Sequence, residues 1–125
     1  QLGDGNLNEV VLGYQAAPQS VTATATLTAA QVASGVLLVG SGATAAQTYT
    51  LPTGTALDAL VSSAKVNSTF ELVLVNLGTS SGTAALAAGT GVTDGGNATV
   101  AISATSSGRF MFRRTGDATY VVYRV

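Results

Sequence analysis

The chain contains no cysteine and no histidine, and charged residues make up only 9 % of its 125 residues. The absence of cysteine excludes a disulfide framework and a thiolate metal site. Without histidine, the commonest general base of enzymes is missing. An ordinary soluble domain has about a quarter of its residues charged, so this surface depends on uncharged polar side chains and backbone amides for contact with water. These absences argue against catalysis and favour a protein whose surface is covered by partners.

The net charge and the hydropathy pattern argue against two classes of partner. Five basic and six acidic residues give a formal net charge of −1, which provides no long-range field to attract nucleic acid or an anionic membrane. No apolar run approaches the roughly 18 residues that a membrane helix requires. Residues 1–20 lack the basic start and apolar block of a secretory signal. We therefore expect no nucleic-acid partner, no membrane partner and no signal peptide.

Length and composition predict one domain preceded by an arm. Alanine, glycine, threonine and serine supply 65 of the 125 residues, which suits closely packed sheets and tight turns within one core. Residues 1–20 are broken by glycine, asparagine and proline, and we expect them to form an extended arm or tether before a single β-sandwich domain at residues 21–125. A terminal tail without a docking role is the alternative. The candidate contacts of the arm with a partner protein or a neighbouring subunit are Val10, Val11, Leu12 and Tyr14.

Apolar and polar residues alternate strictly from Val21 to Thr28, which predicts a strand with one buried face. Thr28 and Gln31 form a capping-box pattern, with Leu27 and Val32 at the staple positions, so a helical turn or two should follow. Gly35 stands where so short a helix requires a left-handed stop.

Further short strands are predicted to the end of the chain. Thr55 is the candidate cap of a second short helix, with Asp58 three residues later where a carboxylate favours a helix start. The glycine-rich stretch 89–96 is expected to be a loop or bulge. The strand at 69–76 is placed centrally, because both of its faces become apolar. The predicted strands after Gly35 are 36–39, 47–51, 69–76, the weaker 83–87 and 98–102, and a hairpin of 109–114 and 119–125.

About eight short strands and two helical turns predict an all-β fold, an antiparallel β-sandwich or small barrel with jelly-roll-like topology. Parallel sheets are not expected, because neither helical segment is long enough to serve as a crossover.

The acidic residues and serines do not form a catalytic pattern. Asp58, Glu71, Asp94 and Asp117 belong to four different predicted elements, whereas acid–base or glycosidic chemistry requires two carboxylates held together. Serine nucleophiles lack a histidine base, and Lys65 is the sole lysine alternative. Asp94 and Asp117 with Asn97 offer too few oxygens for a calcium site. We expect no enzyme activity, no cofactor and no metal.

The four arginines gather in the last seventeen residues, interleaved with aromatic residues: Arg109, Arg113, Arg114 and Arg124. An arginine and aromatic surface can bind single-stranded nucleic acid. Alternation along a strand, however, separates Arg114 from Arg109 and Arg113, so no continuous basic stripe forms. Pairing with Asp117, with Glu71 or with a neighbouring subunit is the preferred interpretation.

Five segments carry a resemblance to a known group: Ala25–Gln31, Tyr49–Asp58, Phe70–Asn76, Ser107–Gly116 and Tyr120–Arg124. In this order they resemble small structural proteins of tailed bacteriophages, which include capsid decoration, head-fibre and other virion structural proteins. The resemblance implies a β-sandwich on the outside of a virion, a homotrimer, and an N-terminal arm that anchors it to the major capsid protein or another virion protein. It brings no catalytic residues.

Two functions of different classes follow. The first is a decoration or cement protein on the exterior of a phage capsid. The alternative is a receptor- or glycan-binding module of a phage fibre, which would require an exposed aromatic platform. The tyrosines available for such a platform are Tyr14, Tyr49, Tyr120 and Tyr123.

Overall fold

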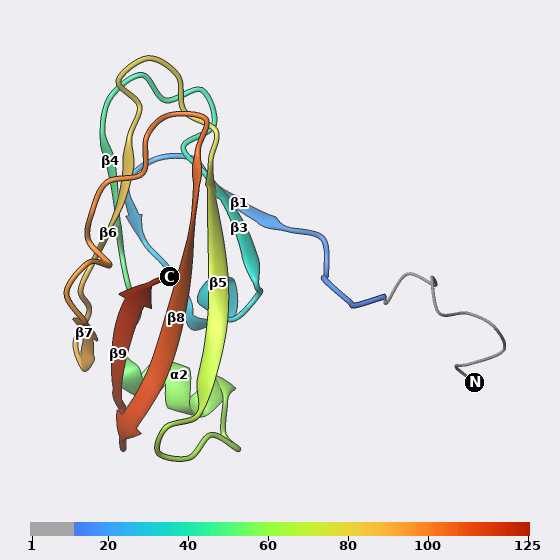
Figure 1. Cartoon of the computed structure of the whole chain (residues 1–125), viewed down its shortest axis with the longest axis vertical. Helices are drawn as coiled ribbons and strands as arrows, with labels where there is room; N and C mark the ends of the chain where they lie inside the picture. The colour runs from blue at the N-terminus through green and yellow to red at the C-terminus, as the bar shows by residue number, and fades with distance from the viewer. Residues whose placement is uncertain (1–11) are drawn as a thin grey trace, which may run out of the picture.

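The computed structural model describes residues 12–125, which form two sheets and two short helices (Figure 1). One sheet has six strands in the order β1-β3-β5-β8-β9-β7, and the other has three in the order β2-β4-β6. In chain order the elements are β1 (Gln19–Val21), β2 (Ala25–Thr26), α1 (Ala29–Val32), β3 (Val36–Val39), β4 (Gln47–Thr50), α2 (Gly54–Leu60), β5 (Thr69–Asn76), β6 (Ala84–Ala87), β7 (Val92–Asp94), β8 (Ser107–Gly116) and β9 (Thr119–Arg124).

The predicted β-rich class with two short helical segments is confirmed, but the predicted antiparallel arrangement is wrong. Within residues 12–125, five of the seven strand pairs are parallel, and only β5–β8 and β8–β9 are antiparallel. A jelly roll is built from antiparallel strands, so this strand order is not that of a jelly roll.

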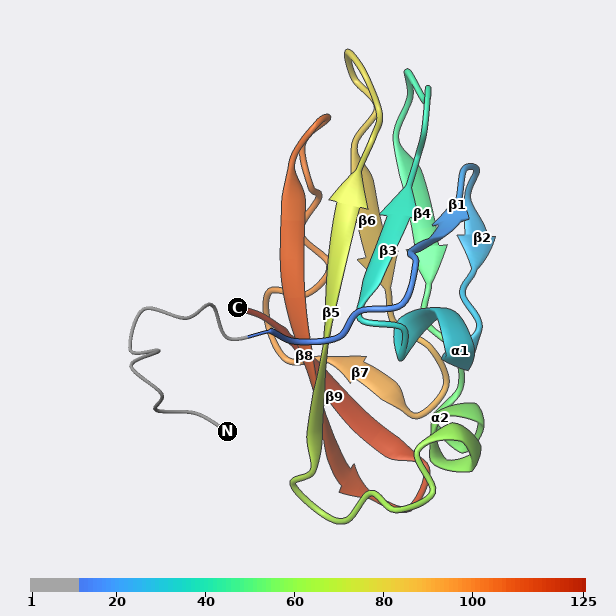
Figure 2. The same ribbon diagram turned by 90° about the vertical axis from the view of Figure 1, so that its right-hand side faces the viewer.

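Parallel pairing arises here because the chain alternates between the two sheets. It passes through β1 in the large sheet, β2 in the small sheet and α1, and then returns to the large sheet as β3 beside β1. The second circuit, β3-β4-α2, places β4 beside β2 and returns to β5 beside β3. Each connection between two parallel strands of one sheet therefore runs through a strand of the other sheet (Figure 2). No long helix is needed for the crossover, contrary to the prediction from the sequence.

The two helices start at threonine caps. The capping box at Thr28 and Gln31 is confirmed: the Thr28 hydroxyl accepts from the Gln31 amide at 3.2 Å, and the Gln31 side chain accepts from the Thr28 amide at 2.9 Å. Gly35 has the expected positive φ, 94°. The predicted cap of α2 is wrong, because Thr53 caps it and accepts from the Ala56 amide at 3.1 Å.

Most of the predicted strands are confirmed, but the predictions for two segments need correction. The alternating segment that begins at Val21 is divided between the sheets as β1 and β2, because the chain crosses from one sheet to the other at residues 22–24. The predicted strand at 98–102 contributes only an isolated bridge of Ile102 to Ala84, while β7 lies inside the stretch predicted to be a loop. There Val92 is buried and pairs with Tyr120 of β9.

The inward faces of both sheets contribute to one hydrophobic core. Strand β8 contributes Phe110 and Phe112 to this core. The Phe112 ring is stacked on the Phe70 ring, with 4.9 Å between the ring centroids. The central position predicted for β5 is confirmed, since it lies between β3 and β8. Complete burial of aliphatic and aromatic side chains provides most of the driving force for such a fold. The buried apolar residues are Leu27, Val32, Leu37, Val39, Tyr49, Leu51, Leu57, Leu72, Leu74, Ala84, Leu86, Val92, Ala98, Ile102, Phe110, Phe112, Tyr120 and Val122.

Asn76 is the buried polar residue that ties β5 to two loops. Its side-chain nitrogen donates to the carbonyls of Gly82, Ile102 and Ser103 at 2.9 to 3.1 Å, and its oxygen accepts from the Gly78 amide at 2.9 Å. For the Gly78 amide and the Gly82 carbonyl, these bonds provide the partner that the backbone does not.

The described part of the predicted arm is extended and exposed. Residues 12–18 contain no helix or strand, and β1 begins at Gln19, slightly before the expected boundary. The Gln15 side chain donates to the Ser34 carbonyl at 2.6 Å, which links this stretch to the start of β3. Leu12 and Tyr14 are 85 % and 94 % exposed. Val10 and Val11 lie outside the described residues.

Candidate functional site

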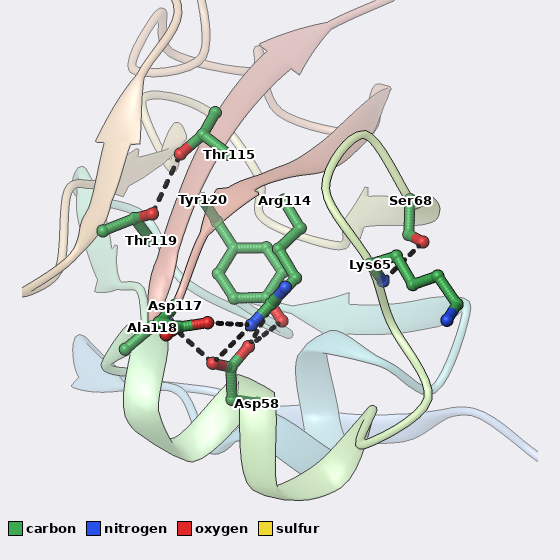
Figure 3. A network of polar contacts seen from close by, with 9 residues as sticks. All are labelled: Asp58, Lys65, Ser68, Arg114, Thr115, Asp117, Ala118, Thr119 and Tyr120. Atoms are coloured by element: carbon green, nitrogen blue, oxygen red, sulfur yellow. Dashed lines mark hydrogen bonds and ion pairs between the residues drawn. The ribbon is translucent and has the colours of Figure 1, made fainter.

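A cluster of charged and polar side chains joins α2 to the β8–β9 hairpin, and Asp58 lies at its centre (Figure 3). One oxygen of Asp58 accepts from Arg114 Nε at 3.0 Å and from the Tyr120 hydroxyl at 2.7 Å. The other accepts from Arg114 Nη2 at 3.2 Å and from the Ala118 amide at 2.6 Å. Arg114 also contacts Asp117 at 3.1 Å. We call these residues, Asp58, Arg114, Asp117, Ala118 and Tyr120, the hairpin lock.

The hairpin lock corrects the interpretation of Asp58 as a helix cap. The true cap, Thr53, lies one turn earlier, which leaves the Asp58 carboxylate free to face the hairpin. The turn position predicted for Asp117 is confirmed, since it lies between β8 and β9. The sequence signal for the lock was weak, because Asp58 and Tyr120 are 62 residues apart.

The electrostatics of the lock favour a structural role. Hydrogen bonds from Arg114, Tyr120 and Ala118 hold the pKa of Asp58 far below its usual range. Burial, with the bond to Asp58, raises the pKa of Tyr120 to about 12. A general acid or base works best with a pKa near the operating pH, and both oxygens of Asp58 already accept bonds from this chain. The arrangement can hold a hairpin against a helix, but it offers no poised proton.

The other acids of the body are engaged in separate contacts. Asp94 accepts from the amides of Gly96 and Ala98 at 2.9 and 2.8 Å, which lowers its pKa. Glu71 lies 3.9 Å from Arg109, with both side chains more than half exposed. Residues 12–125 contain no group of three or more acidic side chains that could hold a metal ion. Asn97, the other residue considered for a calcium site, forms two hydrogen bonds of 2.9 Å with the backbone of Arg124. Its side-chain nitrogen donates to the Arg124 carbonyl, and its side-chain oxygen accepts from the Arg124 amide.

The arginines fall on two sides of the large sheet, as the alternation predicted. Arg114 points inward to the lock, and Arg109 and Arg113 lie on the opposite face of β8. Arg113 donates to the Asn67 side chain at 2.8 Å and to the Tyr123 hydroxyl at 3.0 Å, and its guanidinium lies 5.9 Å from the Tyr123 ring centre. The structure therefore does not bring the four arginines together.

The outward face of the large sheet carries apolar residues on four neighbouring strands, and neither helix nor the small sheet covers it. Cross-strand pairs place Leu38 beside Val75 and Met111 beside Tyr123 on this face. Most of its side chains are half-buried by their neighbours within the sheet. We call it the outer face; its residues are Val36, Leu38, Thr69, Glu71, Val73, Val75, Ser107, Arg109, Met111, Arg113, Val121 and Tyr123. One sign of this face is visible in the sequence, since the predicted strand at 69–76 has apolar residues on both sides.

The tyrosines do not form an exposed platform. Tyr49 is fully buried, with its hydroxyl donating to the Thr22 carbonyl at 3.0 Å, and Tyr120 is 1 % exposed. Tyr123 is half-buried beside Arg113, and Tyr14 lies on the arm. The four side chains are thus separated among the core, the outer face and the arm.

No protein-family model, curated protein or solved structure matches the chain. In residues 12–125, neither helix combines the length and apolar character needed to cross a membrane.

Proposed function

We propose that the chain is a non-enzymatic structural protein that decorates or cements the exterior of a tailed-phage capsid, as a homotrimer contacting the major capsid protein or another virion protein. In this role the two sheets act as the layers of a small β-sandwich. The virion location and the trimer derive from the resemblance of the five sequence segments. The surface chemistry supports a role in assembly independently of that resemblance.

The observation that carries the proposal is the outer face. It presents seven apolar residues on four neighbouring strands, with Glu71, Arg109 and Arg113 as its charged members. Subunit interfaces are depleted in charge at their centres and enriched in aromatic residues, methionine and arginine. A face with this composition suits permanent contact with another protein surface.

The engagement of the acids adds support. Asp58 accepts four hydrogen bonds from its own chain, and Asp94 accepts two from backbone amides. Carboxylates in such contacts stabilise structure and are not presented to a substrate. Asp58 and Asp94 therefore serve the fold of the chain itself.

The test uses purified virions of a phage that carries this chain. We expect the chain at a fixed copy number divisible by three in quantitative mass spectrometry. Virions that lack it should lose resistance to heat and osmotic shock, and purified chain added back should restore it. A Lys65→Glu chain, altered at an exposed loop position, serves as the matched control and should restore resistance equally. Absence of the chain from purified virions would contradict the proposal.

The alternative, a receptor- or glycan-binding module of a phage fibre, makes a different prediction. Carbohydrate sites commonly stack sugars on exposed aromatic rings, and two of the four tyrosines are buried here. Saturable binding of a host polysaccharide by the purified chain, lost on Tyr123→Ala, would support the alternative against the capsid role.

A further inference from the structure

The outer face places apolar and positively charged side chains next to one another on its central strands. Val73, Val75 and Met111 lie on its two central strands, β5 and β8. Arg109 and Arg113 lie on β8 beside them, with Glu71 as the acidic residue of the same face. Glu71 reaches Arg109 only at 3.9 Å, and within residues 12–125 Arg113 forms no ion pair. The face therefore retains an excess of positive charge for a partner.

The N-terminal segment has the complementary composition. Residues 1–18 contain two acids, Asp4 and Glu9, and no lysine or arginine. Apolar residues follow at 10–12, and Tyr14 comes two residues later. An acidic and apolar segment of this kind is complementary to a surface on which arginines lie among apolar residues.

The described part of the arm starts on the side of the molecule where the outer face lies. Gln15 is bonded to the Ser34 carbonyl just before β3. In Figure 1 residues 12–18 run away from β1, on the side of the large sheet opposite the small sheet; in Figure 2 the same stretch crosses in front of β5. Leu12 and Tyr14 are 85 % and 94 % exposed, so their apolar surface is not covered by their own body.

We propose that residues 1–14 of one copy bind the outer face of a neighbouring copy. Val10, Val11 and Leu12 would cover the valines and Met111, and the acids of the segment would face Arg109 and Arg113. This inference deepens the proposed function, on which its choice of a second copy as the partner rests, by naming the surfaces that join the subunits. Exchange of arms is a low-cost route to closed symmetric oligomers.

Cysteine cross-linking tests the contact directly, because the chain has no native cysteine. A Leu12→Cys chain is mixed with a Met111→Cys chain under mild oxidation. We expect a covalent dimer joining the two different chains. The matched control pairs Leu12→Cys with Ala59→Cys, an exposed position on α2, and should give far less dimer. Equal yields in both mixtures would overturn the proposal, and so would cross-linking confined to single chains that carry both Leu12→Cys and Met111→Cys.

A charge exchange tests the recognition without changing the core. Arg109→Glu, at an exposed side chain, should raise the apparent dissociation constant of the oligomer about ten-fold, as loss of a charge contact at an interface does. Glu9→Lys in the same chain should restore much of that loss. Lys65→Glu is the matched control and should leave the constant unchanged. Removal of residues 1–14 should yield monomers; an oligomer that survives this removal overturns the proposal, because another surface then joins the subunits.

The same reagents separate this inference from the proposed function. If the arm-dependent oligomer forms but the chain is absent from virions, the capsid role fails and the arm contact stands. If the chain decorates virions and Met111→Cys is shielded only on the particle, the capsid role stands and the arm contact fails, because a virion protein then covers the outer face.

Discussion

The strands before α2 and those after it differ in charge and in the direction of pairing. From Val10 to Leu57 the chain contains no charged residue, whereas nine charged residues follow from Asp58 onward. The strands β1 to β4 pair with each other only in parallel, and both antiparallel pairs involve the later strand β8. The early circuits are held by backbone bonds and by uncharged caps such as Thr28 and Thr53. The later hairpin is held by stacked rings and an ionic network.

This difference shows two solutions to the same problem. Parallel neighbours come from successive circuits, so each strand is positioned by its ladder and by the cap of the next helix. A two-stranded hairpin has little stability by itself, and its end requires a contact with another element. The contact of Asp58 with the β8–β9 hairpin provides it.

Removal of a core ring in the hairpin region should have the largest effect. Phe112→Ala removes a buried ring stacked on Phe70 and should lower the free energy of unfolding by about 3–5 kcal/mol. Urea unfolding followed by circular dichroism measures it. Val36→Ala, at a half-buried position on the early strand β3, is the comparison and should cost much less. Equal losses would show that the two regions do not differ in packing.

The next effect concerns the buried amide that links the loops. Asn76→Ala removes the partner of the Gly78 amide and of the Gly82 carbonyl, together with one of the two bonds to each of the Ile102 and Ser103 carbonyls, and should cost about 1–3 kcal/mol. Asn97→Ala removes a similar pair of backbone bonds at an exposed position and is the matched control. The difference between their urea midpoints gives the contribution of burial, and a control as damaging as Asn76→Ala would refute that contribution.

The caps should have a smaller and similar effect in both early circuits. Thr28→Ala and Thr53→Ala each remove a hydroxyl that accepts a helix amide, at a cost of about 1 kcal/mol each. Thr28→Ser and Thr53→Ser retain the hydroxyl and should be nearly neutral. A loss for either serine variant equal to that of its alanine counterpart would mean that the methyl group, and not the cap bond, is responsible.

The hairpin lock should contribute fully to stability at neutral pH and lose that contribution at the extremes of pH. The folded pKa of Asp58 is lowered by its hydrogen bonds to Arg114, Tyr120 and Ala118. Its contribution to stability is therefore complete above the ordinary aspartate pKa of about 4 and is lost as the pH falls below that value toward the folded pKa. Asp94, whose pKa is also lowered, should add to the same acid loss.

Tyr120 should cause a loss of stability at alkaline pH. Because its folded pKa is raised to about 12 from a usual 10.0, its contribution is complete below the unfolded pKa and is lost as the pH rises toward the folded one. Unfolding curves between pH 2 and 12 should show both losses. Asp58→Asn should flatten the acid limb relative to Asp94→Asn, and an unchanged acid limb in Asp58→Asn would exclude the lock as its source.

Local features of the fold could be predicted from the sequence, whereas the path between the sheets could not. The Thr28 box, the strand at 69–76 and the final hairpin depend on residues close in sequence, and all are confirmed. The parallel pairing depends on which sheet each short strand joins, and alternation within a strand is the same in either sheet. The short strand β7 was missed because its glycine neighbours dominate the local pattern.

For the hairpin lock and the outer face, too, local patterns could be predicted and contacts between distant elements could not. Alternation correctly separated Arg114 from Arg109 and Arg113, since adjacent side chains on a strand point to opposite faces. It could not indicate that Arg114 meets Asp58, because that contact joins elements 56 residues apart. The pairing of β3, β5, β8 and β9 that creates the outer face likewise becomes visible only in three dimensions.

The alternation of the chain between the sheets limits how its length can change. An inserted segment that adds a full circuit would contribute one strand to each layer and preserve every register beyond it. An insertion that crosses only once would leave all later strands assigned to the wrong layer, with their apolar sides facing water. Variants of this protein with more or fewer strands should therefore differ by whole circuits.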